Sequence, residues 1–167
     1  MNEGWSYIKP ITALPDFDAK VFIALLGLED LPPHVAFIQD NTLFSLTAHG
    51  VEFGSDALRI IRKLWLKRQC ALVECSSSLD ANLTHEIYTS FEALQSGSSC
   101  IDPICRIAEQ HWNIKPKKPF VHGLLHELDA AGLVKNCFVS FQCDDVFVLK
   151  PYSQAVIDKR IEELKRT

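Results

Sequence analysis

The sequence predicts an α+β fold in which helices pack on a small antiparallel sheet. Short apolar runs typical of buried strands are concentrated in the first half of the chain, and amphipathic helical patterns dominate the second half. Turn residues at 39–42 join two extended segments, which favours antiparallel pairing. With 167 residues, 47% of them hydrophobic and 23% charged, the chain has the size and apolar content of one globular domain.

The first half supplies the predicted sheet and one helix. The apolar run AKVFIALLG at 19–27 ends in glycine and is short enough for a buried strand. The segment HVAFIQDNTLFSLTAHGVEF gives two extended stretches joined by a tight turn, and CALVEC at 70–75 returns to the sheet. Between them lies a helical pattern with Ser55 as its cap and basic residues in its last turn.

The second half is predicted to be mostly helical. A helix that begins at Asp80 carries four apolar residues on one face, Leu83, Ile87, Phe91 and Leu94. Further helices are expected at 101–112, 120–131 and 153–167, with a β-hairpin around Asp144-Asp145 between the last two. The linker 113–119 is the predicted boundary. Residues 1–113 then form a core, and 114–167 form a helix–hairpin–helix extension packed on it within a single domain.

Composition and charge limit the partners and the compartment. The net charge of −4 and the pI near 5.8 give no overall basic field, so nucleic acid is not the expected partner. No segment approaches the ~20 uncharged residues that a membrane span needs, and the N-terminus lacks a signal-like pattern. We therefore expect a cytoplasmic protein without a membrane span. Its six cysteines are expected to be thiols rather than disulfides.

Cys100 and His34 are the candidate reactive pair. Cys100 follows SGSS and opens a helix, where backbone N–H groups and the positive end of the dipole favour a thiolate and could hold an oxyanion. His34 stands at the start of an apolar strand, 66 positions earlier, and would supply the base that such a thiol needs. The alternative for each residue is structural: a small buried side chain at a helix start and a hydrogen-bonded edge histidine.

The order of these segments resembles that of the circularly permuted papain-like superfamily, the NlpC-type and lecithin:retinol acyltransferase-like cysteine hydrolases. In that branch a histidine opens a strand in a form like HVAFI, a hairpin leads to a strand that ends in GV, and a cysteine follows at a helix N-terminus. This chain has KVFIALLG, HVAFIQDNTLFSLTAHGV, CALVEC and SGSSCIDPICRIAEQ in that order. The similarity covers about residues 19–112 and is one of order and spacing.

The resemblance implies a permuted papain-like fold and assigns catalytic roles. Cys100 would be the nucleophile of an amide or ester hydrolase or acyltransferase, and His34 the general base. Ser45 matches the position of the polar residue that orients the histidine, with His49 nearby as a substitute. The implied substrate is peptide or lipid-like, with an amide or ester bond. Neither a cofactor nor a metal is expected.

Two alternatives concern the C-terminal part of the chain. Residues 100–150 also resemble a winged helix, with the helix from Phe120 as its recognition helix and the hairpin as its wing. Because basic residues near that helix are few, a winged helix that packs against a protein partner is the better version. His122 and His126 are spaced for one metal ion, but a polar helix face explains both more simply.

The competing functional class is a non-catalytic interaction module. It would be an inactive relative of the permuted papain-like enzymes or a winged-helix adaptor. Ser45 carries no charge with which to orient a histidine, and this departure from an acidic partner is the feature that favours the non-catalytic class.

Overall fold

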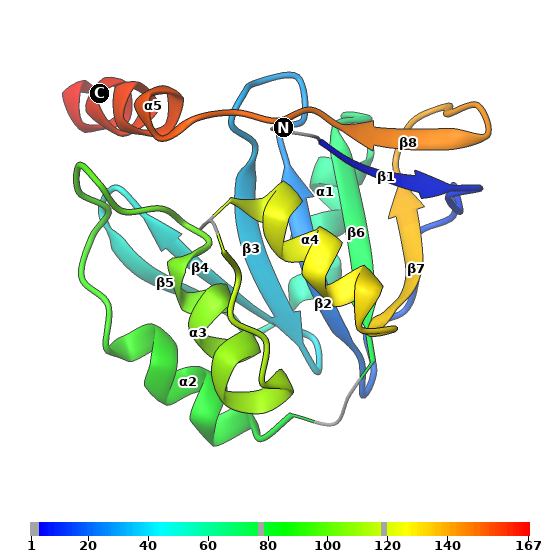
Figure 1. Ribbon diagram of the computed structural model, residues 1–167, viewed down its shortest axis with the longest axis horizontal. Helices are drawn as coiled ribbons and strands as arrows, with labels where there is room; N and C mark the ends of the chain where they lie inside the picture. Colours follow the sequence, from blue (N-terminus) through cyan, green and yellow to red (C-terminus); the bar gives the residue numbers. More distant parts are fainter. Residues whose placement is uncertain (1–3, 77–78, 118–119) are drawn as a thin grey trace.

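The computed structural model describes residues 4–76, 79–117 and 120–167, which form two antiparallel sheets and five helices (Figure 1). The larger sheet has six strands in the spatial order β5 (Gly50–Gly54), β4 (Thr42–Thr47), β3 (His34–Gln39), β2 (Val21–Leu26), β6 (Cys70–Cys75) and β7 (Val134–Val139). The smaller sheet pairs β1 (Trp5–Ile8) with β8 (Val146–Leu149). The helices are α1 (Ala57–Trp65), α2 (Ala81–Thr89), α3 (Asp102–Trp112), α4 (Val121–Ala130) and α5 (Gln154–Arg166). The predicted α+β class with an antiparallel sheet is confirmed.

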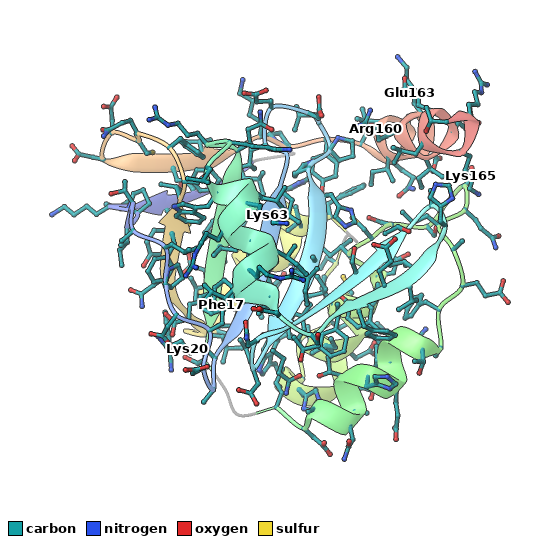
Figure 2. All side chains as sticks on the ribbon, turned by 180° about the vertical axis from the view of Figure 1, so that it is seen from behind. Phe17, Lys20, Lys63, Arg160, Glu163 and Lys165 are labelled. Carbon is teal, nitrogen blue, oxygen red and sulfur yellow. The ribbon has the colours of Figure 1, made fainter. Side chains whose placement is uncertain are left out.

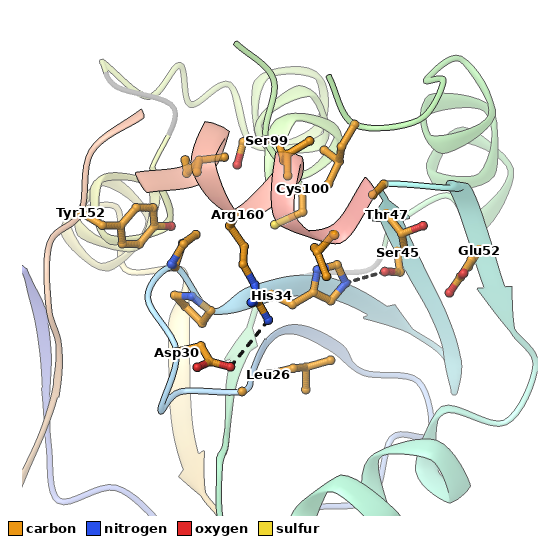
Figure 3. Close-up of a pocket in the computed structure, with 18 of the residues that line it drawn as sticks. Leu26, Asp30, His34, Ser45, Thr47, Glu52, Ser99, Cys100, Tyr152 and Arg160 are labelled. Atoms are coloured by element: carbon orange, nitrogen blue, oxygen red, sulfur yellow. Dashed lines mark hydrogen bonds and ion pairs between the residues drawn. The ribbon is translucent and has the colours of Figure 1, made fainter. Parts of the chain in front are cut away.

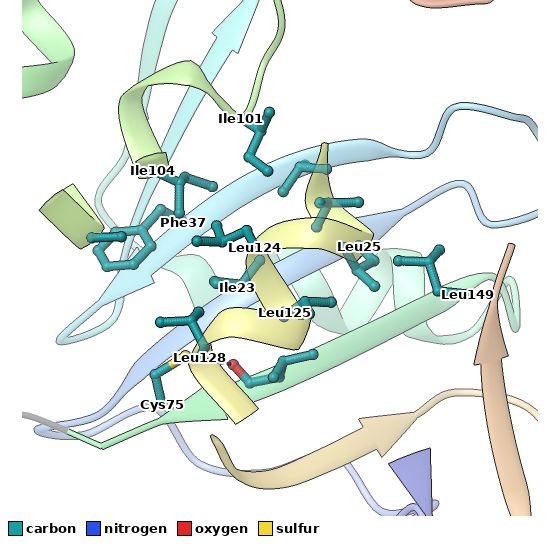
Figure 4. Close-up of a cluster of buried hydrophobic side chains, with 14 of the residues drawn as sticks. Ile23, Leu25, Phe37, Cys75, Ile101, Ile104, Leu124, Leu125, Leu128 and Leu149 are labelled. Atoms are coloured by element: carbon teal, nitrogen blue, oxygen red, sulfur yellow. Dashed lines mark hydrogen bonds between the residues drawn. The ribbon is translucent and has the colours of Figure 1, made fainter. Parts of the chain in front are cut away.

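The two faces of the sheet are separated by the alternation of side chains along each strand. Ile23 and Leu25 on β2, with Phe37 on β3, face α3 and α4, and this side holds the larger core (Figure 4). Phe22 and Ala24 alternate with them and face α1. Seen from behind, α1 lies across the back of the sheet (Figure 2). Helices cover both faces of the sheet. This agrees with the continuous apolar sequences of the central strands, which are typical of strands that are buried on both faces.

The predicted turn between β3 and β4 forms at Asp40 and Asn41. Both have positive φ, 48° and 60°, which matches the twist of a two-residue hairpin and which Asp and Asn tolerate better than most residues. The Asn41 side chain also accepts a hydrogen bond of 2.8 Å from the Leu58 amide, and so ties the turn to α1. The cap of α1 is Asp56, whose carboxylate accepts from the Arg59 amide, and not Ser55 as predicted.

The second predicted helix is shorter than its apolar spacing indicates. α2 ends at Thr89, where the Ser90 hydroxyl donates to the Ile87 carbonyl at 2.6 Å. Leu94 is still buried, but its amide donates to the Thr47 carbonyl at the end of β4. Leu94 is therefore held by a strand rather than by helical hydrogen bonds, which side-chain spacing does not reveal.

The predicted C-terminal hairpin is wrong. β7 pairs with β6 at the edge of the main sheet, whereas β8 pairs with β1, a strand that the sequence analysis did not predict. β6 is buried along its whole length. Its pairing with β7 therefore gives partners to the backbone N–H and C=O groups on the side of β6 that faces away from β2. The winged-helix resemblance is not confirmed.

α4, the predicted recognition helix, packs its apolar face on the sheet instead of facing outward (Figures 1 and 4). With β7 and α4, residues beyond the predicted boundary supply an edge strand and a core helix. Among the described residues no helix combines the length and the apolar character needed to cross a bilayer.

Candidate functional site

The candidate site lies where β3 and β4 separate. Their pairing runs from Gln39 and Thr42 to Ala36 and Ser45, and it ends there. Beyond that point the Thr47 carbonyl accepts from the Leu94 amide at 2.9 Å rather than from β3. Because the strands diverge, His34 on β3 and Ser45 on β4 border an opening at the end of the sheet (Figure 3).

Cys100 lines the same opening, and it directly precedes Ile101, the N-cap residue of α3. Its Sγ accepts a hydrogen bond from the Val35 amide, with an N–Sγ distance of 3.4 Å. The turn before the helix is fixed by Asp102, whose carboxylate accepts from the Ser99 amide at 2.8 Å. The cysteine sulfur is therefore held against the residue that directly follows His34.

His34 is oriented by Ser45. Its Nε2 lies 2.6 Å from the Ser45 Oγ, and Ser45 is almost fully buried. With this nitrogen occupied, Nδ1 is the ring atom that is left to exchange a proton with a thiol. A histidine that acts as a base through Nδ1 carries its proton on Nε2, so in that state the ring donates to the Ser45 hydroxyl.

Cys100, His34 and Ser45 line one pocket of about 490 Å³ (Figure 3). Aliphatic side chains make up much of its wall, among them Leu26, Leu43, Leu64, Leu94, Ile157, Ile161 and Leu164. Three of these residues belong to α5, so the C-terminal helix forms one side of the pocket. Its charged residues are Asp30, Glu52 and Arg160.

Polar contacts attach α5 to the two loops that carry the candidate pair. The Asp158 carboxylate accepts from the Gly97 amide at 2.9 Å, three residues before Cys100. Arg160 lies 3.8 Å from Asp30, in the loop that leads to His34 (Figure 3). α5 therefore contacts both sides of the opening.

Burial sets the protonation of the candidate pair. It raises the pKa of the Cys100 thiol to about 11, because the hydrogen bonds from Val35 and Ser99 only partly offset the desolvation of a thiolate. Burial also lowers the pKa of His34 from 6.5. The two groups are thus a thiol and a neutral imidazole at pH 7. The predicted lowering of the Cys100 pKa by the helix start is wrong, since desolvation outweighs it.

Three of the polar residues that line this pocket were predicted from the sequence, and others were not. Cys100, His34 and Ser45 line the same pocket, whereas His49 is exposed in the turn between β4 and β5 and does not line it. Tyr152 and Arg160 also line it, and no motif pointed to them because they follow the segments that carry the resemblance.

The two histidines of α4 lie in different surroundings. His122 is buried and stacks on Phe120, with ring centroids 5.5 Å apart, while the Nε2 of His126 is 2.8 Å from the Gly4 carbonyl oxygen. The expectation that both occupy a polar face is wrong for His122, which faces the core. In the described part of the chain no group of three or more His, Cys, Asp or Glu residues is arranged to hold a metal ion.

Comparisons of the chain with protein-family models, with curated proteins and with solved structures give no match. The similarity to permuted papain-like enzymes therefore rests on the order and spacing of segments in the sequence alone, and the permuted papain-like fold is not confirmed.

Proposed function

We propose that the protein is a cysteine-dependent amide or ester hydrolase or acyltransferase in which Cys100 is the nucleophile and His34 the general base. One observation carries the proposal. Cys100 and the Ser45-bound ring of His34 line the same pocket, and the sulfur is hydrogen-bonded to the residue next to His34. A nucleophile, a base and a group that orients the base are the parts that acyl transfer by a thiol requires.

The protonation states define how the reaction would begin. Cys100 rests as a thiol, so Nδ1 of His34 takes the Sγ proton as the sulfur attacks the substrate carbonyl carbon. The electron pair of the C=O double bond moves to oxygen. When the tetrahedral intermediate collapses, the bond to the leaving alcohol or amine breaks and His34 returns the proton to it.

A thioester on Cys100 then remains. Water or another acceptor attacks the thioester carbon while His34 takes the acceptor's proton. The carbon–sulfur bond then breaks, and His34 returns that proton to the sulfur, which restores the Cys100 thiol. Hydrolysis and acyl transfer differ only in that acceptor, so the same pocket supports both. Its aliphatic walls suit substrates with an apolar acyl or side-chain group next to the scissile bond, whether peptide or lipid-like.

Formation of the thioester tests the proposal directly. The protein is mixed with 4-nitrophenyl acetate, quenched in acid and examined by peptide mass spectrometry, while release of 4-nitrophenolate gives the rate. We expect an added acetyl group on Cys100, lost in Cys100→Ala. Cys105→Ala is the matched control, because Cys105 lies one turn later and does not line the pocket. Acetylation that spares Cys100, or that survives in Cys100→Ala at the same rate, would contradict the proposal.

A non-catalytic binding module is the second candidate, and the raised pKa of Cys100 favours it. A thiol with a pKa of about 11 is a weak nucleophile unless a base removes its proton during the reaction. The same experiment separates the two functions, since a binding module would acquire no acetyl group at Cys100 faster than at its other thiols.

A further inference from the structure

The backbone around Cys100 leaves one amide for a substrate oxygen. The Ser99 amide donates to Asp102, the Ile101 amide donates to the Ser99 hydroxyl at 3.5 Å, and the Asp102 amide donates to the Ser99 carbonyl. Pro103 has no N–H group. The Cys100 amide is the one that remains, and it faces its own sulfur, next to which a substrate carbonyl would bind. Since an oxyanion site usually needs two donors, the start of α3 supplies only half of one.

Tyr152 brings a second donor into the pocket from the C-terminal part of the chain. It lies between β8 and α5, is 6% exposed and lines the same pocket as Cys100. Its hydroxyl oxygen accepts from the Val121 amide at 3.4 Å. An oxygen that accepts from an amide can still donate its own proton, and in Figure 3 this hydroxyl points toward the part of the pocket where Cys100 lies.

The Tyr152 ring is held rigidly. It makes an edge contact with Phe120, with centroids 5.7 Å apart, and another with His122 at 5.2 Å. Burial and the neighbouring Cys100 raise the pKa of its phenol, so the hydroxyl keeps its proton throughout the neutral range. A buried, protonated donor whose ring is held in place can stabilise developing negative charge.

We propose that the Tyr152 hydroxyl donates a hydrogen bond to the substrate carbonyl oxygen while Cys100 attacks the carbonyl carbon. This role rests on the proposed function. As the carbon–sulfur bond forms, the carbonyl electron pair moves to oxygen, which then carries the negative charge between Tyr152 and the Cys100 amide. Tyr152 keeps its proton, and the thiol proton goes to His34. The C-terminal segment would thus complete the active site of the N-terminal part.

Removal of the single hydroxyl tests this role. Tyr152→Phe keeps the ring contacts with Phe120 and His122. We expect it to lower the rate of Cys100 acetylation by 4-nitrophenyl acetate about a hundredfold. Alkylation of Cys100 by iodoacetamide, a displacement that forms no oxyanion, should change less than about twofold, because no oxygen charge needs stabilising.

Tyr88→Phe is the matched control. Tyr88 is a fully buried phenol on α2 whose oxygen has no hydrogen-bond partner among the described residues, and it does not line the pocket. Its variant should acetylate at the wild-type rate. Equal acetylation by Tyr152→Phe and wild type would overturn the role of Tyr152 and leave the proposed function intact, as would an equal loss of acetylation and alkylation. A wild-type protein that is not acetylated at Cys100 would contradict the proposed function and this role together.

Discussion

The Ser45 hydroxyl oxygen lies 2.6 Å from Nε2 of His34, across the point where β3 and β4 cease to pair. This contact fixes which ring nitrogen can face a thiol, because Ser45 occupies the other. Ser45 orients the imidazole ring, but it carries no negative charge that could stabilise an imidazolium. We therefore expect the hydrogen bond to matter for orientation and to be worth about as much as one neutral hydrogen bond, about 1 kcal/mol.

Ser45→Ala should lower the rate of Cys100 acetylation about five- to tenfold, the rate equivalent of that one hydrogen bond. Ser45→Thr keeps the hydroxyl and should recover most of the rate. His49→Ala is the control, since His49 is exposed and outside the pocket, and it should behave as wild type. A larger effect of His49→Ala than of Ser45→Ala would show that the orienting residue has been misassigned.

The contact between Asp158 and the Gly97 amide should hold the loop that precedes Cys100. Hydrogen bonds from Gly97 and Gln154 lower the pKa of Asp158 from 3.8, so its carboxylate is ionised at neutral pH and accepts from the loop. In Asp158→Ala we expect amide hydrogen exchange at Gly97 to accelerate several-fold, as loss of a protecting hydrogen bond predicts. Glu162→Ala, also on α5 but paired only with Arg166 in the described structure, is the control and should leave Gly97 unchanged. Unchanged exchange in both variants would show that α5 does not restrain the loop.

Leu124 tests whether the C-terminal segment belongs to the core. Its side chain is fully buried on α4 against the main sheet, so Leu124→Ala should lower the free energy of unfolding by about 2–5 kcal/mol. Leu66→Ala removes the same atoms from a residue that is 79% exposed and should change the free energy by less than about 0.5 kcal/mol. Urea unfolding measures both. Equal, small effects would indicate that α4 is only loosely attached.

The strands near the site could be predicted because their patterns are local. Val21–Leu26 and His34–Gln39 are continuous apolar runs buried on both faces, and the turn at Asp40 and Asn41 uses residues that tolerate positive φ. The helices after Cys100 and Phe120 were found because their apolar spacing is undisturbed. The pairing of β7 with β6 could not be predicted, since an alternating pattern shows that a strand forms but not which edge it joins.

The candidate site was only partly predictable for a similar reason. Cys100, His34 and Ser45 lie in segments whose order suggested them. Tyr152 and Arg160 come from a part of the chain that reaches the pocket through tertiary packing, and nothing in the residues around them indicates it. The pKa of Cys100 was mispredicted because the helix start is visible in the sequence, whereas the burial that outweighs it is not.

The pH dependence of Cys100 acetylation, measured for wild type and His34→Ala, tests the central claim that His34 is the base. Burial keeps the pKa of His34 below 6.5, so its ring is already neutral at pH 7. The wild-type rate should therefore be nearly constant between about pH 7 and 9.

In His34→Ala the reaction must use free thiolate. With the thiol pKa at about 11, its rate should start lower and rise about tenfold per pH unit over the same range. Parallel profiles, with wild type rising as steeply as His34→Ala, would contradict the assignment of His34 as the base.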